Sequence, residues 1–184
     1  MREGRCEACH KPHGVMGALL LQAPGDALCV GCHQAYATPP EGAKPHAPLR
    51  RQGCLACHDP HGTGHPALLA AKGDEACFAC HDRAPFNRGH VHKPLRDEGC
   101  AACHDAHASP HAALLCQETT ALCRSCHADT AVLRKQHRGL ALEAVVCSGC
   151  HDPHSSDRGN LLLASLHGPV SEMDCAGCHA SDAA

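Results

Sequence analysis

Sixteen of the seventeen cysteines fall into eight Cys-x-x-Cys pairs, and a histidine directly follows each pair. Two thiols at this spacing can add to the vinyl groups on one edge of a porphyrin, and the adjacent imidazole can then reach the iron from the proximal face. The pattern therefore predicts eight covalent c-type haem sites. The motifs are Cys6–Cys9–His10, Cys29–Cys32–His33, Cys54–Cys57–His58, Cys77–Cys80–His81, Cys100–Cys103–His104, Cys123–Cys126–His127, Cys147–Cys150–His151 and Cys175–Cys178–His179.

Other uses of the Cys-x-x-Cys dyad explain this pattern less well. Zinc ribbons, redox dithiols and iron–sulfur sites share the dyad, and disulfide scaffolds also pair their cysteines. None of these requires a histidine directly after the second cysteine. Histidine is 19 of the 184 residues, so chance places it there about one time in ten. Eight occurrences in eight motifs favour haem.

The composition indicates that side chains alone build a poor core. The chain has no Trp, one Tyr and two Phe, while Gly and Pro together number 30. Ordinary domains fill their interior with aromatic and branched aliphatic side chains. We therefore expect haems to supply the apolar bulk, with short helices around the haem motifs, little or no β-structure and mostly irregular backbone.

The haem motifs belong to an internal repeat. Alternate motifs, here called the odd motifs, begin at Cys6, Cys54, Cys100 and Cys147, a period of 46 to 48 residues. The second repeat reads HAPLRRQGCLACHDPHGTGHPALLAAKGDEACFACH. The first repeat lacks the leading His, and the fourth departs after its first motif. We expect a single elongated domain of four dihaem repeats, at about 1–45, 46–91, 92–136 and 137–184.

The repeat unit, H-x-P-x(4)-G-C-x-x-C-H-D-P-H-G…L-L…C-x-x-C-H, resembles the doubled CXXCH family of multihaem c-type cytochromes. The resemblance covers nearly the whole chain, and it includes the flanking His, the Pro-His step and the Leu-Leu pair. It implies a protein that carries electrons in the periplasm or outside the cell. Some members resemble extracellular cytochromes that polymerise into conductive filaments.

Eleven histidines remain after the eight proximal ones, and eight of them fall into two positional classes. Following histidines lie three residues after the odd proximal His, and leading histidines lie eight residues ahead of a haem motif. His137, ten residues ahead of Cys147, is interpreted as a leading histidine with two residues inserted. We predict that these eight are the distal iron ligands. They are His13, His61, His107 and His154, which follow, and His46, His92, His137 and His167, which lead.

The following histidines carry a geometric argument. Because the porphyrin plane separates its two faces, a His three residues after a proximal His cannot easily reach the far face of the same haem. It can reach a neighbouring iron, and three residues span at most about 10 Å. The spacing therefore predicts haems nearly in contact, which is the arrangement of an electron wire.

The remaining candidate ligands are weaker. His65 and His111 align with each other, but two repeats lack them, so we expect surface or turn roles. His92 fits the repeat spacing better than His90 does. Bis-His ligation leaves no open iron position, and Met16 is the one methionine that could compete.

Three further features have more than one interpretation. Asp59, Asp105 and Asp152 follow odd proximal histidines, and they can either orient an imidazole or cap a turn. Cys116 belongs to no haem motif; a small buried apolar group is favoured over an intermolecular disulfide. The Leu-Leu steps are too short to span a membrane, and we expect them to pack on porphyrin faces.

The net charge and the chemistry of haem attachment indicate the class of partner and the cellular compartment. With both propionates ionised, an oxidised bis-His haem carries a net charge of about −1 and a reduced one about −2. Eight haems then move the net charge of the protein from −3 to roughly −11 when oxidised and −19 when reduced. An acidic surface does not suit nucleic acid, but it suits redox partner proteins or extracellular metal and mineral acceptors. Because haem c is attached outside the cytoplasm, we expect a periplasmic or extracellular protein whose secretion signal is absent from this sequence.

Two function classes remain, a conduit and a reductase. A multihaem reductase needs an open iron and a pocket with acid–base residues. About 23 residues per haem leave little protein for such a pocket. We therefore expect a non-enzymatic electron conduit, either a shuttle or a homopolymeric filament subunit, with a reductase as the alternative.

Overall fold

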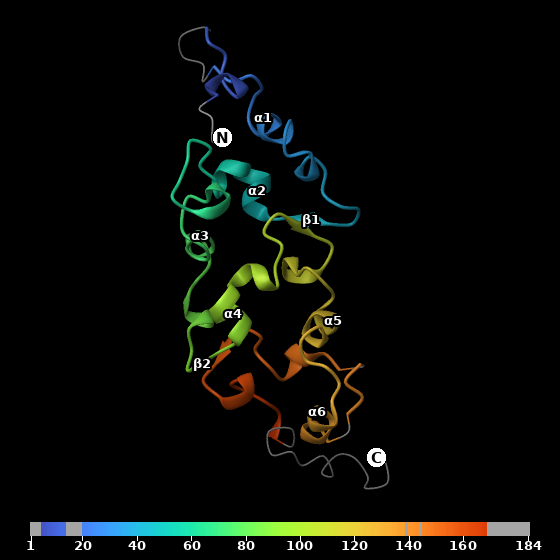
Figure 1. Ribbon diagram of the computed structural model, residues 1–184. Coiled ribbons are helices and arrows are strands. Elements are labelled where there is room, and N and C mark those ends of the chain that lie inside the picture. Colours follow the sequence, from blue (N-terminus) through green and yellow to red (C-terminus); the bar gives the residue numbers. More distant parts are fainter. Residues whose placement is uncertain (1–4, 14–19, 139, 144, 169–184) are drawn as a thin grey trace. The chain divides into compact units, whose positions relative to one another are not determined.

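The computed structural model describes residues 5–13, 20–138, 140–143 and 145–168. The predicted haem site Cys175–Cys178–His179 and Met16 lie outside these residues. Within them the backbone is mostly irregular, as expected from the composition, and short helices interrupt it (Figure 1). The α-helices are α1 (Asp26–Val30), α2 (Ala47–Gln52), α3 (Glu75–Phe78), α4 (Lys93–Glu98), α5 (Thr119–Arg124) and α6 (Ala131–Gln136).

Within the described residues, the β-structure consists of two short antiparallel pairs, which join the first repeat to the third and the second repeat to the fourth. β1 (Lys44–Pro45) pairs with β3 (Ala108–Ser109), and β2 (His90–Val91) pairs with β4 (Ser155–Ser156). The same register recurs in both pairs. β1 directly precedes the leading histidine His46, and its partner β3 directly follows the following histidine His107. β2 and β4 bear the same relation to His92 and His154.

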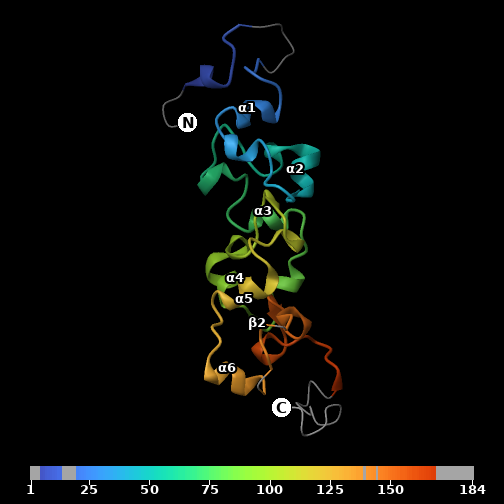
Figure 2. The same ribbon diagram turned by 90° about the vertical axis from the view of Figure 1, so that its right-hand side faces the viewer.

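Two compact units interleave segments of successive repeats. One unit comprises Met1–Ala76 with Asp105–Leu114, and the other comprises Cys77–His104 with Leu115–Ala184. The β1–β3 pair lies in the first unit. The β2–β4 pair lies in the second, where Figure 2 shows β2 beside the orange-to-red segment. A repeat of the sequence is therefore not a compact unit of the fold.

Side chains form almost no apolar interior. Among the described residues no hydrophobic side chain is buried, and the buried residues are Gly53, Ser109, Ser155 and Ser156. Large apolar side chains such as Leu55 and Val132 stay exposed. A chain that exposes its apolar groups in this way lacks the burial that normally stabilises a domain, as the composition predicted.

Each Cys-x-x-Cys-His motif forms a single helical turn. The backbone N–H of the histidine donates to the carbonyl of the first cysteine at 2.8–3.1 Å in all seven described motifs. The odd motifs lie on 3₁₀ turns such as Cys54–Ala56, whereas Cys29, Cys77 and Cys123 lie on α1, α3 and α5. Because residues i, i+3 and i+4 of a helical turn share one face, both thiols and the imidazole point the same way.

A return hairpin follows each odd motif and brings the Leu-Leu step back to the proximal histidine. The bridges are His10↔Leu21, His58↔Leu69, His104↔Leu115 and His151↔Leu162. The hairpin turns through consecutive residues with positive φ, such as Ala67 (54°) and Leu68 (55°). This left-handed conformation costs an L-residue roughly 1–2 kcal/mol. The strain recurs in three repeats, which indicates that the turn serves the site.

We expect Ala67→Gly to stabilise the holoprotein. Glycine adopts positive φ without a Cβ clash, and this gain exceeds its extra unfolded-state entropy, so the net is about 0.5–1 kcal/mol. Denaturant unfolding of the holoprotein measures the difference. Asn160, which has the same conformation at φ 56°, is the matched control, because Asn tolerates positive φ better than Ala. An equal gain from Asn160→Gly would contradict strain relief as the cause.

Candidate functional site

The leading histidines His46 and His92 are held at the helix starts by the next repeat. They are the N-cap residues of α2 and α4. The His92 N–H donates to the His154 carbonyl at 2.9 Å, and its Nδ1 lies 2.9 Å from the Pro153 carbonyl. His46 makes the same two contacts with the third repeat, and its Nδ1 lies 3.1 Å from the Ala106 carbonyl. With the proton on Nδ1, Nε2 is the ring nitrogen that can bind a metal.

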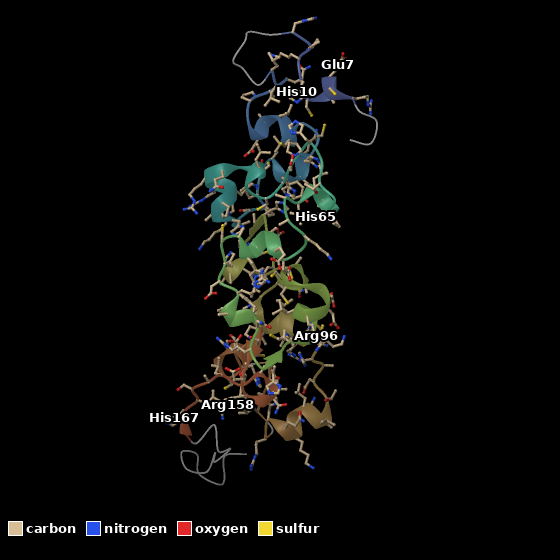
Figure 3. The ribbon with its side chains drawn as sticks, turned by 90° about the vertical axis from the view of Figure 1, so that its left-hand side faces the viewer. Glu7, His10, His65, Arg96, Arg158 and His167 are labelled. Atoms are coloured by element: carbon tan, nitrogen blue, oxygen red, sulfur yellow. The ribbon has the colours of Figure 1, made fainter. Side chains whose placement is uncertain are left out.

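Three following histidines stand opposite the odd proximal histidine of the preceding repeat. Each pair of rings is nearly parallel, with interplanar angles of 5–18°. The ring-centre separations are 6.1 Å for His10–His61, 6.2 Å for His58–His107 and 6.0 Å for His104–His154. Thus His61 faces His10 and not its own neighbour His58. Figure 3 labels His10 near one end of the described chain.

Two further pairs have the same separation. The leading histidine His92 lies 6.1 Å from the proximal His127, with planes 16° apart. His137 lies 6.1 Å from His151, with planes 52° apart. At least five of the seven described proximal histidines therefore face another imidazole within their own compact unit.

The common separation has a simple chemical meaning. A metal–imidazole nitrogen bond is about 2.0–2.1 Å, and that nitrogen lies about 1.1 Å from its ring centre. Two imidazoles on opposite sides of one metal ion therefore have ring centres about 6.2 Å apart. The observed 6.0–6.2 Å fits two axial ligands of one iron. Stacking contact would bring the rings closer.

The thiols and imidazoles together fit covalently attached haem. Each described motif presents two thiols and a proximal imidazole on one face, and five motifs have a second imidazole at axial spacing. The sequence model of the family described as "Doubled CXXCH motif" matches residues 1–38, 46–86 and 92–132. The chain belongs to this family. It is a multihaem c-type cytochrome, a class that binds haem c covalently and transfers electrons.

A comparison of this doubled CXXCH cytochrome with curated proteins finds no match. In the part of the chain that the structure describes, every helix is too short or too polar to cross a lipid bilayer.

His137 of the cytochrome does not occupy the position expected of a leading histidine. His46 and His92 begin a helix, whereas His137 follows the last residue of α6. Its Nδ1 lies 2.9 Å from the carbonyl of Leu133 in that same helix. The interpretation as a leading element with two inserted residues is therefore wrong. The imidazole nevertheless lies at axial spacing from His151.

The other predicted ligands lie in less complete surroundings. His13 and His167 are exposed, and within the described residues no imidazole faces either of them. The aromatic neighbour of His33 is Tyr36, with ring centres 6.5 Å apart. Their assignment as iron ligands therefore remains a prediction from the repeat.

The proximal imidazoles have anchors that the sequence did not suggest. The Nδ1 of His58 lies 2.8 Å from the Ala67 carbonyl, and that of His151 lies 2.8 Å from the Asn160 carbonyl. Both carbonyls belong to the positive-φ residues of the return hairpin. The left-handed turn thus directs an acceptor at the proximal ring, which fixes its tautomer. In the sequence, the position of this acceptor is marked only by the residue directly before the Leu-Leu step.

The aspartates that follow the odd proximal histidines cap a turn, which is one of the two roles expected of them. The carboxylates of Asp59, Asp105 and Asp152 accept the N–H of the residue two positions later at 2.8–3.0 Å, which caps the turn. The same oxygens lie 3.8, 3.7 and 3.5 Å from Nδ1 of the following histidines. Burial acts to raise the pKa of Asp152, but the His154 N–H and the Arg88 guanidinium outweigh it and lower this pKa.

Cysteines of successive motifs lie close together in the cytochrome. The Asp26 carboxylate at the start of α1 accepts the Cys54 N–H at 3.0 Å, and a Cβ on Gly53 would collide with it. Burial, then Asp26 and Cys29, raise the pKa of the Cys54 thiol to about 12. Burial and Cys147 raise that of Cys123 to about 11. An even motif therefore lies against the next odd motif, a contact that no local sequence pattern reveals.

The residues expected to be peripheral have structural roles. The His65 N–H donates to the Thr63 hydroxyl and the His111 N–H to the Ser109 hydroxyl, so both belong to turns. His90 lies in β2, whereas His92 faces a proximal ring, as the repeat spacing favoured. Cys116 is exposed, so its expected burial is wrong.

Proposed function

We propose that this cytochrome binds eight covalent haems, one at each motif, and conducts electrons along irons that each have two histidine ligands. The irons at His10, His58 and His104 take His61, His107 and His154 as distal ligands. The iron at His127 takes His92, and the iron at His151 takes His137. His13, His46 and His167 serve further irons of the same series.

The axial spacing of imidazole pairs carries this proposal. Five pairs, drawn from four repeats and from two kinds of distal position, share a ring-centre separation of 6.0–6.2 Å. The interplanar angle varies from 5° to 52° across the same pairs. A metal between the rings fixes their separation but not their rotation about the bond axis, so this combination supports bis-His ligation.

The distal ligands also connect the sites. His58 and His61 lie three residues apart, yet one faces His107 and the other faces His10. His151 and His154 likewise face His137 and His104. A three-residue link spans at most about 10 Å, so these irons are held at close range. The Cys29–Cys54 and Cys123–Cys147 contacts join even sites to the next odd sites.

A conduit is favoured over an enzyme by the same ligands. A paired imidazole occupies the position at which substrate would bind, and catalysis at iron needs that position open. We infer a periplasmic or extracellular location, because haem c is attached outside the cytoplasm. The partners are redox proteins or extracellular metal and mineral acceptors, and the chain acts as a shuttle or as a filament subunit.

Haem content and spin state test the proposal. Intact-mass and pyridine haemochromogen measurements should give eight haems per chain. Electron paramagnetic resonance of the oxidised protein should show low-spin ferric iron, with rhombic signals from the nearly parallel imidazole pairs. A large high-spin ferric signal in the intact protein would contradict full bis-His ligation and would favour the reductase alternative.

A further inference from the structure

Two haem sites of the cytochrome have the same ligand geometry but different surroundings. The His58–His107 and His104–His154 pairs have ring separations of 6.2 and 6.0 Å and angles of 5° and 12°. In each, the Nδ1 of the following histidine lies near an aspartate, Asp105 at 3.7 Å and Asp152 at 3.5 Å. The sites therefore offer a comparison within one chain.

Only the second of these aspartates has an arginine partner among the described contacts. The Arg88 Nη1 lies 2.7 Å from Oδ2 of Asp152 and also donates to the Ser155 carbonyl at 3.0 Å. The Arg88 N–H donates to the Ser155 hydroxyl, and that hydroxyl donates to the Pro85 carbonyl. Ser155 is fully buried. The guanidinium is thus held in place by the backbone as well as by the carboxylate.

When the repeats are aligned on their leading histidines, the residue that corresponds to Arg88 at the Asp105 site is the uncharged Gly42. Arg88 lies four residues ahead of the leading histidine His92, and Gly42 lies four residues ahead of His46. The contacts of the Asp105 carboxylate are to the N–H groups of His107 and Ala108 and to the His107 ring. In the charged groups that contact these aspartates, the two sites thus differ by one guanidinium.

We propose that Arg88 raises the reduction potential of the iron at His104–His154 above that of the iron at His58–His107. A carboxylate beside a distal imidazole favours the ferric state, because it increases the basicity of the ligand and adds negative charge near the iron. Arg88 offsets that charge at Asp152, whereas Asp105 keeps its full effect. Electrons therefore reside preferentially at the His104 site. This inference depends on the bis-His ligation proposed above.

Burial strengthens the contrast in the same direction. The Asp152 side chain is 17% exposed and that of Asp105 is 49% exposed, so charges interact more strongly around Asp152. An aromatic ring packs on the distal histidine at both sites, Phe86 at 4.7 Å from His154 and Tyr36 at 4.5 Å from His107, so the difference in burial rests on the aspartates. A drier haem site also disfavours the more positive ferric iron.

Arg88→Gln tests the proposal in the holoprotein by spectroelectrochemical titration at the reduced haem band. With eight haems, one-eighth of the amplitude should move to lower potential while the low-spin ferric spectrum stays unchanged. Arg88→Lys, which keeps the charge, should restore most of the original curve. Asp105→Asn and Asp152→Asn retain the turn-capping oxygen. Each should move one-eighth of the amplitude to higher potential, and the shift should be larger for Asp105→Asn than for Asp152→Asn.

The double variant Arg88→Gln/Asp152→Asn distinguishes an effect of Arg88 through Asp152 from a nonspecific effect of removing one positive charge from the protein. It should titrate as Asp152→Asn does, because Arg88 acts through that carboxylate. Arg96→Gln removes the same charge from an exposed pair on α4 (Figure 3) and should shift the curve less. No downward shift in Arg88→Gln, or a shift equal to that of Arg96→Gln, overturns the inference. Loss of low-spin iron in Arg88→Gln also overturns it, since Arg88 would then support the ligand. Absence of bis-His signals in the unmodified protein instead refutes the proposed function.

Discussion

His107→Ala is expected to turn one of the eight proposed haem irons from low-spin to high-spin, with no loss of attached haem. The ring of His107 lies 6.2 Å from that of His58, at the separation of two axial ligands. Alanine cannot reach the iron, whereas the thioethers at Cys54 and Cys57 and the proximal His58 remain. One-eighth of the ferric signal should become high-spin, and the reduced protein should bind about one carbon monoxide per chain at the vacated position.

The control for this variant lies on the same loop. His111 follows His107 by four residues, and its N–H donates to the Ser109 hydroxyl, so we expect His111→Ala to leave the spin state unchanged. Added imidazole should return His107→Ala toward the low-spin spectrum. A His107→Ala protein that stays fully low-spin and binds no carbon monoxide would show that His107 is not a ligand of the iron.

The sequence predicted the parts of the site that the repeat determines. A Cys-x-x-Cys-His motif closes one helical turn, so its three groups share a face whatever surrounds them. The following histidines were expected to serve a neighbouring iron because the tether is too short for their own. The structure places His61 opposite His10 accordingly. Poor aromatic and aliphatic content likewise predicted an irregular fold without an apolar core.

What the sequence did not predict depends on contacts distant along the chain. Arg88 meets Asp152 across 64 residues, and Asp26 meets Cys54 across 28. Neither pair forms a local motif, so no spacing rule could find it. His137 was misplaced for a different reason. Counting residues back from the haem motif ignores α6, which ends just before His137 and makes it a C-terminal helix residue.

Production of the chain without haem attachment is expected to abolish its cooperative fold. Ordering a residue costs about 1–2 kcal/mol of backbone entropy, and burial of apolar side chains normally offsets this. Within the described residues no hydrophobic side chain is buried. The porphyrins and iron–histidine bonds must therefore supply the stabilisation, as metal binding does in small metal-dependent domains. Far-UV circular dichroism and amide NMR of the haem-free chain should show an unfolded protein.

Removal of a single haem measures the same dependence within the matured protein. Cys54→Ser/Cys57→Ser removes the anchor of the proposed haem at His58, whose iron would join residues 58 and 107 of one compact unit. We expect earlier thermal unfolding and rapid proteolysis of that unit. Cys116→Ser is the matched control, because Cys116 is exposed and belongs to no haem motif, so its loss should change neither haem content nor stability. A folded haem-free chain, with dispersed amide signals and a sharp melting transition, would show that the polypeptide has a source of stability other than its haems.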